Sequence, residues 1–160
     1  MMKTAILVTQ IILSNLAIGL FSLPALGVDL ALQVMNKKPQ SGTLFVELYK
    51  PSSVAEEHDE WQHIESVSTH TFKIVEAQKK HVFSLSGLAI GTTCIRAFLD
   101  VNANERLDRS PMGVPKEPVA FANNPPLFLG EPVPAKGCFE LTEEQQQLVL
   151  KLQQKKRKKA

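Results

Sequence analysis

The stretch TTCIRAFLDVNANERLD, residues 92–108, decides the fold. Its first eight residues alternate between two faces, one with Thr93, Ile95, Ala97 and Leu99 and the other with Cys94, Arg96 and Phe98. A period of two is typical of a β-strand, because successive side chains point to opposite faces of a sheet. Asp100 and a run rich in Asp and Asn follow directly. We therefore expect a β-strand that ends in a tight polar loop.

The same period of two recurs on both sides of this stretch. It predicts further strands at residues 29–34, 43–50, 71–77, 81–88, 138–141 and 148–152. Turn signals rich in Pro and Gly separate them, at residues 39–42, 87–91 and 125–137. About seven short alternating strands are typical of an antiparallel β-sandwich. The expected fold class is therefore all-β, with one sandwich domain over residues 28–152.

Two segments are ambiguous between helix and strand. In residues 52–63, Ser53 is followed three residues later by Glu56, a capping pattern that predicts a short helix, with Trp61 packing on the body. Thr142 and Gln145 form a similar pattern before residues 148–152. There the alternation of apolar residues favours a turn followed by a final strand.

The N-terminus has the pattern of a secretory signal peptide over residues 1–27. Lys3 supplies the positive charge, residues 5–23 are apolar, and Ala25-Leu26-Gly27 offers small residues at a cleavage site. An uncleaved membrane anchor is the alternative, because the apolar stretch is almost long enough to span a bilayer. We expect an exported protein, periplasmic or extracellular.

The charges are unevenly distributed behind a net charge of +2, which excludes a strongly basic nucleic-acid binder. Residues 28–150 hold eleven basic and sixteen acidic side chains, a net of −5, whereas residues 151–160 hold six basic side chains and no acidic one. We expect residues 153–160 to be a disordered basic tail, because a run of like charges repels itself. Its alternatives are a solvated tail, an intramolecular contact with the acidic body, or a contact with an anionic envelope surface through Lys155, Lys156, Arg157, Lys158 and Lys159.

The chain has two cysteines, Cys94 and Cys138. An even number of cysteines in an exported protein favours a disulfide. Two separate buried thiols are the alternative.

The loop after the central strand has the residue types of a calcium site. Oxygen-bearing side chains fall at positions 1, 3, 5 and 9, and a hard cation needs several such oxygens on a short curled backbone. The candidate ligands are Asp100, Asn102, Asn104, Asp108, the carbonyl of Arg106 and, if the chain folds back, Glu117.

Two departures from the calcium pattern weaken it. Position 6, where glycine supplies a positive φ, is Glu105, and position 12, where a bidentate Glu is usual, is Pro111. Any calcium affinity is therefore expected to be weak, on the order of 10⁻⁴–10⁻³ M. The alternative is a metal-free loop, because Asp and Asn side chains make tight turns by bonding their own backbone.

Residues 97–126, AFLDVNANERLDRSPMGVPKEPVAFANNPP, resemble the signature of a bacterial exported family known as domain of unknown function 2141. The resemblance covers residues 42–152 and implies a small exported β-sandwich with no established activity. The chain departs from the family pattern at Leu99, where histidine is usual, and at Ala103 and Glu105, where glycines are usual. The matching positions are Phe98, Asp100, Asn102, Asn104, Leu107, Asp108, Gly113, Pro115, Glu117, Phe121, Asn123 and Asn124.

The sequence contains no Gly-x-Ser-x-Gly, no His-Glu-x-x-His and no glycine-rich phosphate loop. We therefore expect a non-catalytic module, binding or structural, with calcium as the one candidate cofactor and no nucleic-acid partner. The alternatives are an envelope-associated protein held by its basic tail, and an enzyme acting on an envelope polymer through a cleft lined by Asp100, Asp108 or Glu117.

Overall fold

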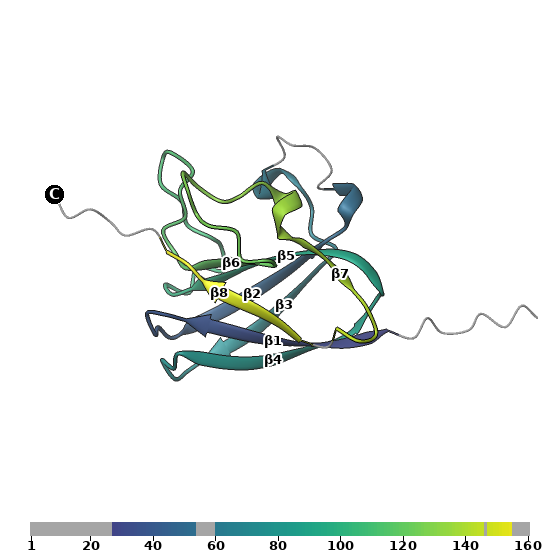
Figure 1. The fold of residues 1–160 in the computed structure, drawn as a ribbon. Helices are drawn as coiled ribbons and strands as arrows, with labels where there is room; N and C mark the ends of the chain where they lie inside the picture. The colour runs from purple at the N-terminus through teal and green to yellow at the C-terminus, as the bar shows by residue number, and fades with distance from the viewer. Residues whose placement is uncertain (1–26, 54–59, 146, 155–160) are drawn as a thin grey trace, which may run out of the picture.

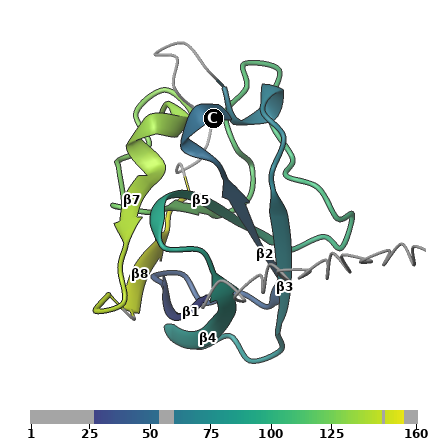
Figure 2. The same cartoon turned by 90° about the vertical axis from the view of Figure 1, so that its right-hand side faces the viewer.

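A computed structural model describes residues 27–53, 60–145 and 147–154. These residues form eight strands in two sheets that pack face to face (Figure 1). Figure 2 shows the same two layers after a quarter turn. The three-stranded sheet has the order β4-β1-β8, made of β1 (Val28–Asn36), β4 (Lys80–Leu88) and β8 (Gln147–Leu152).

The five-stranded sheet has β5 (Gly91–Asp100) at its centre. One edge of β5 pairs with β2 along its length, and the other edge pairs first with β7 and then with β6. The remaining strands are β2 (Gly42–Tyr49), β3 (Ser68–Ile74), β6 (Val119–Phe121) and β7 (Cys138–Leu141). The predicted all-β sandwich is confirmed, and all seven predicted strands are present.

One pairing differs from the antiparallel expectation. β8 runs parallel to β1, with Leu32 opposite Leu148 and Val34 opposite Leu150, whereas every other strand pair described is antiparallel. β8 enters the three-stranded sheet from β7, which belongs to the other sheet. Because no hairpin joins β8 to β1, no tight turn forces them to run antiparallel.

The core between the sheets follows the predicted alternation of side chains. Leu30, Leu32 and Val34 of β1 are fully buried, while the residues between them are only partly buried. Leu148, Leu150 and Leu152 of β8 extend the same layer, and alternate residues of β2 and β5 face it: Leu44, Val46, Leu48, Ile95, Ala97 and Leu99. Burying one apolar face of each sheet against the other is the main stabilising term of such a fold.

A second apolar cluster covers the other face of the five-stranded sheet. Tyr49, Trp61, Phe98 and Phe121 pack there, and the Phe98 ring stacks on Phe45 with 4.8 Å between ring centroids. β5 is therefore buried on both faces from Cys94 to Asp100.

The segment predicted as a short helix is described only at its ends. Pro51–Ser53 (η1) and Trp61–His63 (η2) are single 3₁₀ turns, and residues 54–59 lie outside the described residues. Trp61 packs on the body as predicted, 3% exposed, and its indole N–H donates to the carbonyl of Pro132 at 2.8 Å. The third such turn, η3 (Pro134–Gly137), leads into β7.

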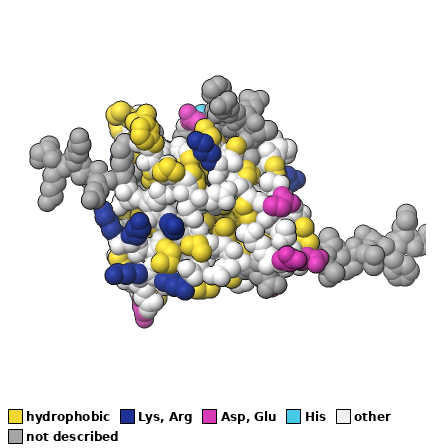
Figure 3. Space-filling model, viewed as in Figure 1, with side chains coloured by type: hydrophobic (Ala, Val, Ile, Leu, Met, Phe, Trp, Pro, Cys, Tyr) yellow, Lys and Arg dark blue, Asp and Glu magenta, His cyan; other side chains and the backbone are white. Residues whose placement is uncertain are grey.

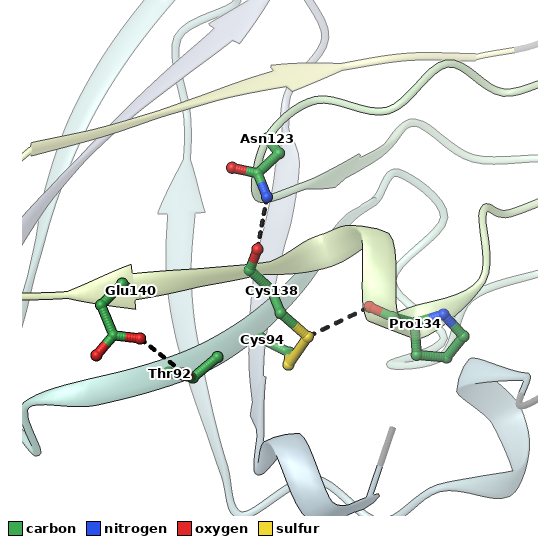
Figure 4. Close-up of a disulfide and its surroundings, with 6 residues drawn as sticks. All are labelled: Thr92, Cys94, Asn123, Pro134, Cys138 and Glu140. Atoms are coloured by element: carbon green, nitrogen blue, oxygen red, sulfur yellow. Dashed lines mark hydrogen bonds between the residues drawn. A yellow bond between two sulfur atoms is a disulfide. The ribbon is translucent and has the colours of Figure 1, made fainter. Parts of the chain in front are cut away.

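The predicted disulfide joins Cys94 to Cys138 and is present (Figure 4). The two residues are directly opposite each other on β5 and β7, 44 positions apart in sequence. The disulfide therefore fastens β7 to the central strand. Cys94 is fully buried beneath the second apolar cluster.

The two chain ends are described only in part. The predicted signal peptide lies outside the described residues except for Gly27, and so do residues 155–160 of the predicted tail. Gln153 is bridged to Val119, so the folded body reaches at least to Gln153, the first residue of the predicted tail. Among the described residues, no helix is long and apolar enough to cross a membrane.

Candidate functional site

The loop at residues 100–108, which we call the Asp/Asn loop, is built around a buried carboxylate. Asp100 ends β5 and is 2% exposed. Its Oδ1 accepts hydrogen bonds from the backbone N–H groups of Asn102 at 3.2 Å and Asn104 at 3.3 Å, and its Oδ2 accepts one from Glu105 at 2.8 Å. The carboxylate thus curls the chain around itself, as the residue types predicted.

Glu117 folds back onto this loop, as the sequence analysis required of a sixth ligand. It is 3% exposed, and its Oε1 accepts from the backbone N–H of Val101 at 2.9 Å. Its Oε2 accepts from the N–H of Asp108 at 3.2 Å. Hydrogen bonds of this charge-assisted kind compensate a buried carboxylate for the water it has lost.

The three remaining polar side chains meet near the surface of the loop. The amide nitrogens of Asn102 and Asn104 donate to Asp108 Oδ2 at 2.7 and 3.2 Å. The hydrogen bond from Asn102, with help from Asn104 and the nearby Arg106, holds the pKa of Asp108 below its usual value. Arg106 is mainly exposed, and its Nε lies 3.8 Å from Asp108 Oδ1.

The backbone of the loop is left-handed at two non-glycine residues. Ala103 has φ 60° and Glu105 has φ 61°. These are the two positions where the resembling family has glycines, and the positive φ expected at position 6 is present. Only glycine adopts this conformation without a steric penalty, so each residue costs about 1 kcal/mol.

The structure therefore brings all five candidate side chains together: Asp100, Asn102, Asn104, Asp108 and Glu117. It divides them into two kinds. The oxygens of Asp100 and Glu117 point at backbone N–H groups, whereas Asn102, Asn104 and Asp108 point at one another. Within the described ranges, no three His, Cys, Asp or Glu side chains are grouped to hold a metal ion.

A second polar cluster, which the sequence analysis missed, lies on the outer face of the five-stranded sheet. Arg96, 7% exposed, contacts Glu47 Oε2 through its Nη2 at 2.6 Å and lies 3.6 Å from Glu131 Oε1 through its Nη1. Arg109 Nη2 contacts Glu131 Oε2 at 2.5 Å. Two arginines and two glutamates thus form one network that links β2, β5 and two loops.

Aromatic rings enclose this network. The Arg96 guanidinium lies 5.9 Å from the centre of the Tyr49 ring and 5.8 Å from that of Trp61, and the Tyr49 hydroxyl donates to Glu47 Oε2 at 2.9 Å. Burial raises the pKa of Tyr49 well above its usual value. Burial also opposes the charge of Arg96, but Glu47, Tyr49 and Glu131 outweigh this effect and raise its pKa.

The register of β2 on β5 would have revealed part of this network, because Glu47 is directly opposite Arg96. The register between two strands cannot be predicted from the sequence of either strand alone. Beside the network lies a cavity of about 410 Å³, with Trp61, Arg109 and Glu131 in its wall. Neither this cavity nor a second one at the end of the three-stranded sheet is lined by Asp100, Asp108 or Glu117.

The fold and this site define a class: a small disulfide-linked β-sandwich whose central strand ends in a carboxylate-organised loop. A family model described as "Uncharacterized protein conserved in bacteria (DUF2141)" matches residues 32–149. The chain belongs to this family, as the resemblance indicated. No curated protein and no solved structure gave a match.

Proposed function

We propose that the protein is an exported, non-catalytic β-sandwich module of the cell envelope, binding or structural, whose Asp/Asn loop binds calcium. Membership of a bacterial family of unknown activity is consistent with this role. The Cys94–Cys138 disulfide supports export, because such bonds persist in oxidising compartments.

One observation carries the calcium proposal: Asn102, Asn104 and Asp108 converge on a single point. The amide nitrogens of Asn102 and Asn104 are directed at Asp108 Oδ2. Rotation of each side-chain amide by 180° exchanges its nitrogen with its oxygen, so that both amide oxygens point toward Asp108. Three oxygen ligands then surround the position that the amide hydrogens occupy. The rotation of Asn104 gives up one hydrogen bond, from the Arg106 N–H to its Oδ1.

Asp100 and Glu117 hold the loop in the shape that this convergence needs. Their hydrogen bonds to five backbone N–H groups form without the ion, so the loop is largely preorganised. Preorganisation lowers the entropy that binding must overcome. With few charged ligands facing the ion, the affinity is of the millimolar class found in extracellular modules.

Thermal unfolding in 0–10 mM calcium chloride tests the proposal. A ligand that binds only the folded state at about ten times its Kd adds about 1.4 kcal/mol to the free energy of unfolding, so we expect Tm to rise by about 3–6 °C. Magnesium should raise Tm less, because it demands a more regular coordination shell.

The variant Asp108→Asn keeps the side-chain size but removes the charge, and it should lose the calcium shift. Glu140→Gln is the matched control, because Glu140 is an exposed carboxylate on β7 whose partner is Thr92. A wild-type Tm that does not respond to calcium, or an Asp108→Asn variant that responds like the wild type, would reject the calcium site.

A second candidate function is attachment to an anionic envelope surface through the tail residues Lys155, Lys156, Arg157, Lys158 and Lys159. The contact that Gln154 makes with the folded domain favours this attachment. The Gln154 side chain donates to the carbonyl of Lys116 at 2.6 Å, so the basic run begins directly at the folded body, with no linker between them.

Replacing all five basic tail residues by glutamine in the full chain tests this attachment. Each basic residue near an anionic bilayer contributes about 1 kcal/mol, so partition onto phosphatidylglycerol vesicles should fall more than a hundredfold at low salt. Vesicles of phosphatidylcholine alone are the control. Unchanged partition of the neutralised variant would exclude the tail as the attachment point.

A further inference from the structure

Five lysines that are scattered in the sequence meet at one end of the three-stranded sheet. Met35 of β1 is opposite Lys80 of β4 on one side and Lys151 of β8 on the other. Lys37 and Lys38 directly follow β1, and the Asn36 N–H donates to the carbonyl of Lys79 at 2.8 Å. Figure 3 shows Lys and Arg side chains gathered at this end. We call these five residues the lysine face: Lys37, Lys38, Lys79, Lys80 and Lys151.

The lysines of the lysine face form no ion pair with an acidic side chain among the described residues. All five lysines are exposed. In the described part of the chain, none of them lies within 4.0 Å of a carboxylate. Glu76, in the turn between β3 and β4, hydrogen-bonds with Gln78 instead. An acidic domain thus carries one strongly positive end.

This end is also hollowed. A cavity of about 340 Å³ has Lys37, Lys38 and Lys151 in its wall, and no acidic residue lines it. Its floor is fixed by Asn124, which donates to the carbonyl of Val149 at 2.7 Å and accepts from the N–H of Lys151 at 2.7 Å. Its volume lies at the lower end of the range for small-ligand pockets, about 300–1,000 Å³, and its lysines supply the charge to hold an anion.

Exposed apolar side chains flank the lysines. Val82 is 60% exposed and lies two residues after Lys80, on the same face of β4. Val75 is 82% exposed and begins the turn that leads to Lys79. Lysine stems beside exposed aliphatic groups suit the boundary between headgroups and acyl chains, where the ammonium groups reach the phosphates.

We propose that the lysine face docks on a bilayer of anionic phospholipid and that the cavity takes one phosphate-bearing headgroup. This inference takes from the second candidate function only the anionic surface, and it places the attachment in the folded domain. The described chain ends at Gln154, which itself lines the cavity, so the basic tail begins beside the same site.

Partition of the full chain onto vesicles of phosphatidylglycerol and phosphatidylcholine tests the proposal. The variant Lys37→Gln/Lys38→Gln/Lys151→Gln should bind about a hundredfold more weakly, from about 1 kcal/mol for each lysine near the surface. The matched control is Lys50→Gln/Lys73→Gln/Lys136→Gln, which removes the same charge from exposed positions outside the lysine face. It should bind within about threefold of the wild type.

The result that overturns the proposal is an equal loss in both triple variants, since net charge alone then explains binding. Binding of inorganic phosphate, seen as NMR shifts of the Lys37, Lys38 and Lys151 amides, without vesicle partition overturns lipid docking in favour of a soluble phosphate.

The variant with the neutralised tail separates the two proposals. If it loses binding and the cavity variant does not, the tail attachment stands and this inference fails. If the cavity variant loses binding and the neutralised tail does not, the inference stands and the tail candidate fails.

Discussion

At the scale of single residues, Glu105 occupies a backbone conformation that its own side chain disfavours. Its N–H is held by Asp100 Oδ2, and the loop can close only with φ near +60° at this position. We expect Glu105→Gly to raise the free energy of unfolding by up to about 1 kcal/mol, because the steric penalty that glycine removes outweighs the freedom that it adds to the unfolded chain. Urea unfolding followed by circular dichroism measures the change.

The control for this substitution is Arg106→Gly. Arg106 is the next residue of the same loop, is also exposed, and has no positive φ. Glycine there should lower stability by about 0.5–1 kcal/mol, because it adds freedom to the unfolded chain. A loss of stability in Glu105→Gly would mean that the strain inferred at this residue is absent.

Arg96 shows what a residue pattern cannot predict. In the sequence it is a charged residue on one face of an alternating strand, which suggests a solvent-facing side. In the structure that face is covered by Trp61 and the loop that carries Glu131, so the charge is buried with its partners. The burial arises from loops distant in sequence, and no property of the strand itself reports it.

At the scale of elements, β5 is the central strand of the five-stranded sheet, and β7 is a short partner that follows it at a distance in sequence. Four residues of β7 pair with β5, and the disulfide stands at the end of that pairing (Figure 4). Closing a loop of about 45 residues restricts the unfolded chain and contributes about 4 kcal/mol in the chain-entropy model.

We therefore expect Cys94→Ala/Cys138→Ala to lower the free energy of unfolding by about 3–4 kcal/mol, measured by urea unfolding. Thr92→Ala is the control on the same two strands. It removes one exposed hydrogen bond, from Thr92 Oγ1 to Glu140 at 2.7 Å, and should cost less than about 1 kcal/mol. A loss below 1 kcal/mol in the double variant would show that pairing alone holds β7.

The strands that the sequence predicted and the one it missed differ in a physical way. The side chains of residues 43–50 and 92–99 alternate between two faces because one face of each strand packs in the main core. This alternation can be recognised in the sequence. β6 is three residues long, and Val119, Ala120 and Phe121 are all buried. Three residues are too few to show a period of two, so the pattern of β6 is that of any short apolar run.

At the scale of the whole molecule, the sandwich and the loop that follows β5 were predictable from local pattern, while the distribution of charge was not. The positions of Lys37, Lys80 and Lys151 form no run in the sequence. They become neighbours only because β4 and β8 flank β1. The net charge of residues 28–150 therefore indicates an acidic body but does not indicate that one end of it is positive.

The place of β8 has a consequence for how the chain reaches its folded state. β8 is the last strand of the described residues, and it supplies three leucines to the core, paired in parallel with β1. A chain that is made from its N-terminus cannot finish this core until Gln147–Leu152 is available to pair. The core between the two sheets is therefore completed only when β8 pairs with β1.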